Sequence, residues 1–218
     1  MAIKPILFNK QVSTEMVRAI LDERKSCTRR LVTTRRKAAC GFYVTKKADG
    51  TFSGIYEYDE NESMFDNPLM PPYQPGDILY VRETWHKYTK RVGGGESCHL
   101  TEFYGYKASI ANSEDVNEPW RPSIHMPKEA ARIWLKVTDV RAEQLQEITP
   151  ENAVKEGTKE IFPPLAVDEF RDIWNSTIKK SDLERYDWNA NPWVWVIEFE
   201  RCEKPQNEGG SSKTDPTG

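Results

Sequence analysis

The sequence predicts an α+β domain, built as a small, mostly antiparallel β-barrel or curved sheet with two or three flanking helices. The first observation is the element order, which runs from strand and helix through several separated strands to two helices and a last strand. Strands that do not alternate regularly with helices argue against a doubly wound parallel sheet. The second is the length, since 218 residues can bury one core but are short for two. We therefore expect one domain over residues 1–202 and a disordered, polar tail over residues 203–218.

Residues 1–25 are expected to hold a strand followed by a helix. The apolar run Pro5-Ile6-Leu7-Phe8 is typical of a short buried strand. After it, apolar residues recur at helical spacing between positions 16 and 21, and Ser13 or Thr14 is available as the N-cap. If this helix continued through Lys25 and Thr28, the amine and the hydroxyl would share one face.

The most basic segment of the chain begins at the end of that helix. Residues 24–37 include seven Lys or Arg residues and no acidic residue, although the whole chain has a net charge of −3. The segment has two interpretations. It is a solvated basic face, or Arg29 and Arg30 contact phosphate, because guanidinium groups match phosphate oxygens bidentately. Residues 31–34 are expected to form a strand that leaves it.

Two insertions are predicted, at about residues 38–74 and 86–124. The first should contain a hairpin, because Asp49-Gly50 supplies the positive φ of a tight turn between two runs rich in aromatic residues. Between the insertions, residues 77–85 alternate as a strand does, with Tyr80 and Arg82 on one side and Glu83 on the other. The second insertion is expected to be irregular.

The C-terminal third predicts two strands and two helices. Residues 133–141 and 192–199 are expected to form strands. Between them, Thr149 is placed to cap a helix that has Pro150 at its first position and ends at Gly157. Apolar residues at helical spacing predict a further helix over residues 167–178.

Several of these segments, in this order, resemble an ASCH domain, a PUA-like β-barrel linked with RNA and modified nucleosides. The segments are Lys25-Ser26-Cys27-Thr28-Arg29-Arg30 with its preceding helix, Pro75-Gly76-Asp77-Ile78-Leu79-Tyr80-Val81, the helix of residues 149–157 and Val194-Trp195-Val196-Ile197-Glu198-Phe199. The likeness covers residues 1 to about 201. It is closest to phage- and prophage-encoded ASCH-like proteins, on Tyr80-Val81-Arg82-Glu83-Thr84-Trp85, Ser123-Ile124-His125-Met126-Pro127 and Asn189-Ala190-Asn191-Pro192-Trp193-Val194-Trp195.

The resemblance also implies a catalytic set. Some small ASCH proteins are amidohydrolases that remove the acyl group from N4-acetylcytidine with a Lys, a Thr and a Glu. The Lys-x-x-Thr pair falls on Lys25 and Thr28, and the carboxylate falls on Glu156, with Glu151 as the alternative. The chemistry is reasonable, because a Thr hydroxyl becomes a nucleophile only when a base takes its proton. A basic helix end with a capping hydroxyl is the competing interpretation.

A binding pocket is expected between residues 25–30, residues 82–85 and the helix of residues 150–157. Trp85 would stack on a base and Glu83 would contact its edge, with Arg82 beside them. The structural alternative for Trp85 is a place in the core. Two functions remain open, an amidohydrolase of N4-acetylcytidine type or a non-catalytic RNA- or nucleotide-binding module acting as a phage accessory protein.

The expected partners are RNA, a nucleotide or a modified nucleoside, without a membrane partner. No cofactor and no metal are expected, because the His and Cys residues show no ligand spacing. Four scattered Cys residues without a Cys-x-x-Cys motif are typical of reduced thiols. With neither a signal peptide nor a long apolar run, we expect a cytoplasmic protein, in the host cell if phage-encoded.

Overall fold

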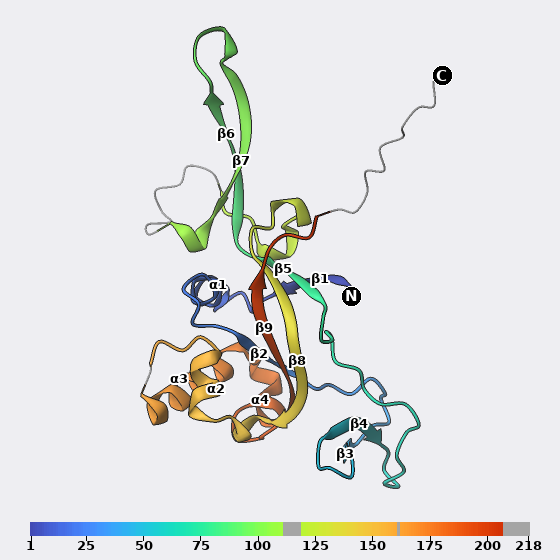
Figure 1. Cartoon of the computed structure of the whole chain (residues 1–218). Helices are drawn as coiled ribbons and strands as arrows, with labels where there is room; N and C mark the ends of the chain where they lie inside the picture. The colour runs from blue at the N-terminus through green and yellow to red at the C-terminus, as the bar shows by residue number, and fades with distance from the viewer. Residues whose placement is uncertain (111–118, 161, 207–218) are drawn as a thin grey trace, which may run out of the picture.

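The computed structural model describes residues 1–110, 119–160 and 162–206. A five-stranded sheet lies at its centre, and Figure 1 shows how the other elements are arranged around it. The hydrogen-bonded order is β1-β5-β8-β9-β2. Their bounds are Ile3–Leu7 for β1, Ile78–Arg82 for β5, Trp134–Gln144 for β8, Trp193–Cys202 for β9 and Cys27–Leu31 for β2. β1 runs parallel to β5, and the other neighbours are antiparallel. The sheet confirms the α+β class and the predominance of antiparallel pairs; the expected disordered tail over residues 203–218 falls mostly outside the described part.

The two edge strands of this sheet approach each other at one end. The Arg30 side chain of β2 donates a hydrogen bond to the backbone carbonyl of Leu7 at the end of β1. A side chain, and not a backbone ladder, therefore joins the edges at this point. The mostly antiparallel pairing of the sheet agrees with the predicted fold class.

Two hairpins project from this body (Figure 1). The first pairs β3, Gly41–Lys46, with β4, Phe52–Tyr58, and Gly50 has the positive φ of +82° that the sequence predicted. The second pairs β6, Trp85–Val92, with β7, His99–Tyr106. The expectation that residues 86–124 are irregular was therefore wrong for this part. The outer half of β6 lacks an apolar face because its residues are exposed on both sides, so the strand pattern is weak.

The described residues form four α-helices beside the central sheet (Figure 1). They are α1, Ser13–Leu21; α2, Pro150–Lys155; α3, Pro163–Thr177; and α4, Leu183–Tyr186. Thr149 caps α2 and Gly157 follows it with φ +94°, both as predicted. Single 3-10 turns lie at Gly95–Ser97, Lys107–Ser109, Ser123–His125, Lys128–Ala130, Leu145–Glu147 and Lys180–Asp182.

The path after α1 differs from the sequence expectation. α1 ends at Leu21, and Glu23 adopts a positive φ of +60° that turns the chain away from the helix axis. Lys25 therefore lies in an extended bridge, and Thr28 lies in β2. The strand predicted over residues 31–34 begins at Cys27 instead. Lys25 and Thr28 do not share a helix face.

Strand β9 forms part of two cores, because both of its faces are buried. Trp195, Ile197 and Phe199 pack into the cluster that contains α1. Val194 and Val196 face the other way, into the cluster that α2 and α3 cover with Phe170 and Trp174 among others. Alternate side chains of a strand point to opposite faces, so this one strand fixes α1 and the α2–α3 pair on either side of the sheet. The functional candidates lie where these layers meet β2.

Candidate functional site

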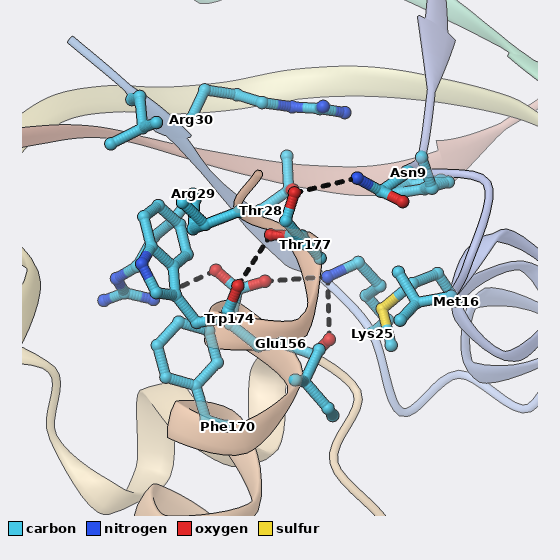
Figure 2. Close-up of a pocket in the computed structure, with 15 residues that line it drawn as sticks. Asn9, Met16, Lys25, Thr28, Arg29, Arg30, Glu156, Phe170, Trp174 and Thr177 are labelled. Carbon is cyan, nitrogen blue, oxygen red and sulfur yellow. Dashed lines mark hydrogen bonds and ion pairs between the residues drawn. The ribbon is translucent and has the colours of Figure 1, made fainter. Parts of the chain in front are cut away.

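A cavity of about 230 Å³ opens beside β2, between the end of β1, α1 and α3. Its polar lining includes Lys25, Thr28, Arg29, Arg30 and Glu156 (Figure 2). The rest of the lining comes from Phe8, Asn9, Val12, Met16, Leu31, Phe170, Ile173, Trp174, Thr177 and Ile178. An apolar cavity with a few convergent polar groups is the usual form of a small-ligand site.

Glu156 is the centre of the polar cluster. Its Oε2 accepts a hydrogen bond from Lys25 Nζ at 2.8 Å, and its Oε1 accepts one from Arg29 Nη1 at 3.1 Å. Lys25 Nζ also donates to the backbone carbonyl of Glu156 at 2.7 Å. Figure 2 shows the two cations reaching the carboxylate from opposite sides. The alternative carboxylate, Glu151, is exposed at the other end of α2.

The end of α2 is held against Lys25 by backbone contacts. Lys25 and Glu156 form an isolated antiparallel bridge, and the backbone N–H of Ser26 donates to the carbonyl of Lys155. A Cβ at Gly157 would lie 2.8 Å from Cβ of Ala19 and 3.1 Å from Cβ of Lys25. Only glycine permits both this approach and the positive φ, so Gly157 allows Glu156 and Lys25 to meet.

Thr28 lies in β2 with its backbone in register with Ile197. The residue is buried, and it lines the cavity together with Lys25 and Glu156. Within the described part of the chain, no hydrogen bond is formed by the Thr28 hydroxyl. This hydroxyl is therefore not already committed to a structural partner.

Arg29 and Arg30 have different surroundings although they are neighbours in the sequence. The Arg29 side chain has no exposed surface, and it forms ion pairs with Glu156 and with Glu143 of β8, each at 3.1 Å. Its guanidinium faces two carboxylates and the ring of Phe170. Arg30 instead lies over the ring of Phe8, and burial lowers its pKa from the ordinary value.

Cys27 lies beside this charged cluster but differs from it chemically. Burial raises the pKa of its thiol to about 12, and the nearby charge of Glu156 acts in the same direction. Sγ lies 3.9 Å from the backbone oxygen of Asn152 and 3.8 Å from Nη1 of Arg29. The thiol therefore remains protonated near neutral pH and is a poor nucleophile, since the thiolate is the reactive form.

Arg82, Glu83 and Trp85 are not among the residues that line this cavity. Glu83 is buried and receives two hydrogen bonds from Arg132, at 2.8 and 2.9 Å. Trp85 is buried in a third apolar cluster, and Arg82 donates to the backbone carbonyl of Met126. These residues hold the base of the second hairpin and residues 126–132 together.

Helix α3 and the end of β1 supply most of the apolar lining that sequence reasoning missed. Phe170 and Trp174 lie in the helix predicted over residues 167–178, and they pack in the apolar cluster under it, as expected. They also form one wall of the cavity. Phe8 contacts the cations of both Lys25 and Arg30 through its ring face, with centroid distances of 5.6 and 5.7 Å. The available signal was the aromatic residue directly after a buried strand.

Among the residues that the structure describes, no group of three or more His, Cys, Asp or Glu side chains is arranged to hold a metal ion. In the same residues, no helix is long and apolar enough to span a membrane.

No family model matches the chain, and no curated protein matches it. Among solved structures, the chain is similar to the crystal structure of an ASCH domain from Lactobacillus crispatus JV V101. The identity is 10%, the TM-score is 0.44, and the match covers 92% of this chain and 79% of that chain.

Proposed function

We propose that the cavity beside β2 binds a nucleotide or modified nucleoside and hydrolyses an N4-acylcytosine amide bond. The single observation that carries the proposal is the convergence of Lys25, Thr28 and Glu156 in one cavity. Lys25 and Glu156 are 131 positions apart in the sequence and in direct contact in the fold. They are the same three residue types, at the same positions, that the ASCH resemblance implies.

The size and lining of the cavity support a small, partly aromatic ligand. Its volume of about 230 Å³ lies just below the roughly 300–1,000 Å³ of drug-sized sites. Phe8, Phe170 and Trp174 provide apolar surface beside the polar cluster. Unpaired nucleobases are commonly recognised by aromatic and guanidinium planes, and this lining offers both.

Thr28 would act as the nucleophile in this proposal. Its Oγ1 attacks the acyl carbon, and its proton passes to the Lys25–Glu156 pair. The C–N bond then breaks, and the proton returns to the departing N4 amine of cytosine. Water hydrolyses the resulting Thr ester and releases the carboxylic acid. Glu156 orients the Lys25 amine throughout, and Arg29 fixes the other oxygen of Glu156.

The test is release of acetate from N4-acetylcytidine by the purified protein. We expect Thr28→Val to abolish turnover and Thr28→Ser to retain part of it, because only the hydroxyl is required. Lys25→Ala and Glu156→Gln should also lose turnover. Lys155→Ala and Glu151→Gln, exposed neighbours on α2, serve as matched controls and should turn over substrate normally.

A binding module without catalysis is the second candidate, and one observation favours it. Lys25 Nζ already donates to two oxygens of Glu156, as a structural ion pair would. Thermal unfolding with and without cytidine and its nucleotides separates the two functions, since a ligand at 100 times its Kd adds about 2.7 kcal/mol of stability. Stabilisation without acetate release, lost in Lys25→Ala, would support the binding module. Acetate release that persists in Thr28→Val would exclude Thr28 as the nucleophile.

A further inference from the structure

The candidate site is the first of three adjoining cavities along β2 and the residues that follow it. The first is the cavity that contains Glu156. The second, of about 360 Å³, is lined by Leu7, Arg30, Pro72 and Tyr73. The third, of about 260 Å³, is lined by Leu31, Val32, Thr33, Arg35, Leu69, Met70, Pro72 and Trp195. We call the second and third cavities together the β2 groove.

The β2 groove adjoins the Glu156 cavity through shared walls. Arg30 lines both the Glu156 cavity and the second cavity, and Leu31 lines both the Glu156 cavity and the third. Pro72 lines both parts of the groove. Arg30 and Leu31 therefore lie at the boundary between the Glu156 cavity and the groove, where the Arg30 guanidinium also donates to the carbonyl of Leu7.

The charge of the groove is positive. Its lining contains two guanidinium groups, those of Arg30 and Arg35, and no carboxylate. Within the described ranges, neither arginine takes part in an ion pair. Glu57, which lies next to Arg35, is buried, and its Oε1 accepts hydrogen bonds from the backbone N–H groups of Arg35 and Arg36. The groove is therefore complementary to an anionic chain.

Arg30 is the most informative of these residues. Its guanidinium donates to the carbonyl of Leu7, and its buried Nε has no hydrogen-bond partner. The buried Nε of Arg29 also has no hydrogen-bond partner, but the Arg29 guanidinium forms ion pairs with two carboxylates. Burial destabilises the Arg30 cation, the nearby charge of Glu156 offsets part of that cost, and an anionic ligand would offset more of it. Arg30 stands between the two compartments, where such a ligand would pass.

Tyr73 gives the groove an aromatic surface. Its hydroxyl donates to the backbone carbonyl of Pro5 at 2.8 Å, which fixes the half-buried ring at the groove wall. Aromatic rings in a basic groove bind the bases of single strands by stacking, with little sequence preference. The wall comes from residues 69–73, at the end of the segment predicted as the first insertion, so this segment acquires a ligand-binding role.

We propose that the β2 groove binds the neighbouring nucleotides of a single-stranded polynucleotide whose target base enters the Glu156 cavity. This inference rests on the proposed function and narrows its ligand from a free nucleotide to a nucleotide within a strand. Arg30 contacts the phosphate at the cavity entrance, Arg35 contacts a phosphate further along, and Tyr73 stacks on an adjacent base. RNA and DNA strands share this chemistry.

The experiment compares three probes by calorimetric titration of the full chain: cytidine 5′-monophosphate, a single-stranded RNA of five cytidines and the DNA strand of five deoxycytidines. We expect either pentamer to bind at least tenfold more tightly than the monophosphate. Arg35→Ala should weaken pentamer binding several-fold and leave monophosphate binding unchanged. For pentamer binding by Arg35→Ala, the plot of log K against log salt concentration should be shallower by about 0.7, the value for one lost phosphate contact on a single strand.

The control variant is Lys90→Ala, which removes an exposed cation from the second hairpin, outside the groove lining. It should bind all three probes as the parent protein does. Tyr73→Ala should weaken the binding of both pentamers by about tenfold, the effect expected when one base loses its stacking partner. Preference for one pentamer identifies the strand as RNA or DNA.

Two results would overturn the proposal that the β2 groove binds a strand. One is pentamer binding no tighter than monophosphate binding; the other is equal effects of Arg35→Ala and Lys90→Ala. The proposed function fails on separate results. It fails if neither the monophosphate nor either pentamer binds the protein, or if the pentamers bind but N4-acetylcytidine is not hydrolysed. Pentamer binding that Arg35→Ala weakens supports the groove in either case.

Discussion

Arg29 binds Oε1 of Glu156 at 3.1 Å, through a guanidinium that has no exposed surface. The sequence placed Arg29 in a basic run with a solvated face as one interpretation, yet its side chain points inward between Glu156 and Glu143. Lys25 holds the other oxygen of Glu156. The carboxylate is thus fixed at both oxygens, and its orientation does not depend on Lys25 alone.

Replacing Arg29 by Met should destabilise the fold strongly. The substitution leaves Glu156 and Glu143 each short of a buried cation, and breaking a buried pair from one side costs about 3–5 kcal/mol. Urea unfolding monitored by tryptophan fluorescence measures the change. Arg171→Met is the control, because its ion pairs with Asp168 and Asp172 are exposed and should contribute at most about 1 kcal/mol. Equal losses in the two variants would contradict the assignment of Arg29 as a buried anchor.

The Cys27 thiol should resist alkylation in the folded protein. Its pKa is raised to about 12 by burial, whereas Cys40 and Cys98 are exposed. Iodoacetamide at pH 8 is expected to label Cys40 and Cys98 within minutes and Cys27 only after unfolding in denaturant. Mass spectrometry of tryptic peptides identifies the labelled sites. Rapid labelling of Cys27 under native conditions would show that the site opens.

The same thiol makes stability depend on pH in the alkaline range. The pKa of Cys27 is higher in the folded state, about 12, than the ordinary thiol value of 9.0, so the unfolded state loses its proton first. Below pH 9 the contribution is constant; between pH 9 and 12 the free energy of unfolding should fall by about 1.4 kcal/mol per pH unit. Cys27→Ala should remove this slope, as urea titrations at several pH values would measure. An unchanged slope in Cys27→Ala would assign the loss to other groups.

Gly157→Ala should be more destabilising than Gly50→Ala. Both glycines have positive φ, +94° and +82°, so both substitutions incur backbone strain of about 1 kcal/mol. Only the Cβ at position 157 would also collide, at 2.8 Å from Ala19, whereas no atom lies within 4 Å at position 50. The difference between the two unfolding free energies measures the crowding. A loss at position 157 no greater than that at position 50 would mean that α2 can move away from Lys25 without cost.

Local patterns predicted the elements that carry the candidate site. The Thr149 cap, Pro150 and Gly157 defined α2 closely, because a cap, a proline and a positive φ act within one helical turn. The Asp49-Gly50 turn gave the first hairpin for the same reason. The sequence alone missed β6 and β7, because both faces of the outer hairpin are largely exposed and leave no alternation to detect.

The relative positions of Lys25 and Thr28 depend on the residue at which α1 ends. α1 ends at Leu21, so these residues meet in the cavity from an extended segment and a strand. The expected grouping of Arg82, Glu83 and Trp85 with them did not appear in the cavity lining. The base of the second hairpin uses these side chains for its own packing.

The sequence by itself determined the α+β class, the limits of α2, the presence of a last strand at β9, and the residue types available to the site. Only the tertiary structure decided which charges became buried. β2 orients Arg29 toward Glu156 and Glu143, and it leaves Arg30 between two cavities without an ion pair to any described residue. Periodicity and capping are short-range and appear in a window of residues. The partner of a buried charge is fixed by packing between segments more than a hundred residues apart, and that packing leaves no local pattern.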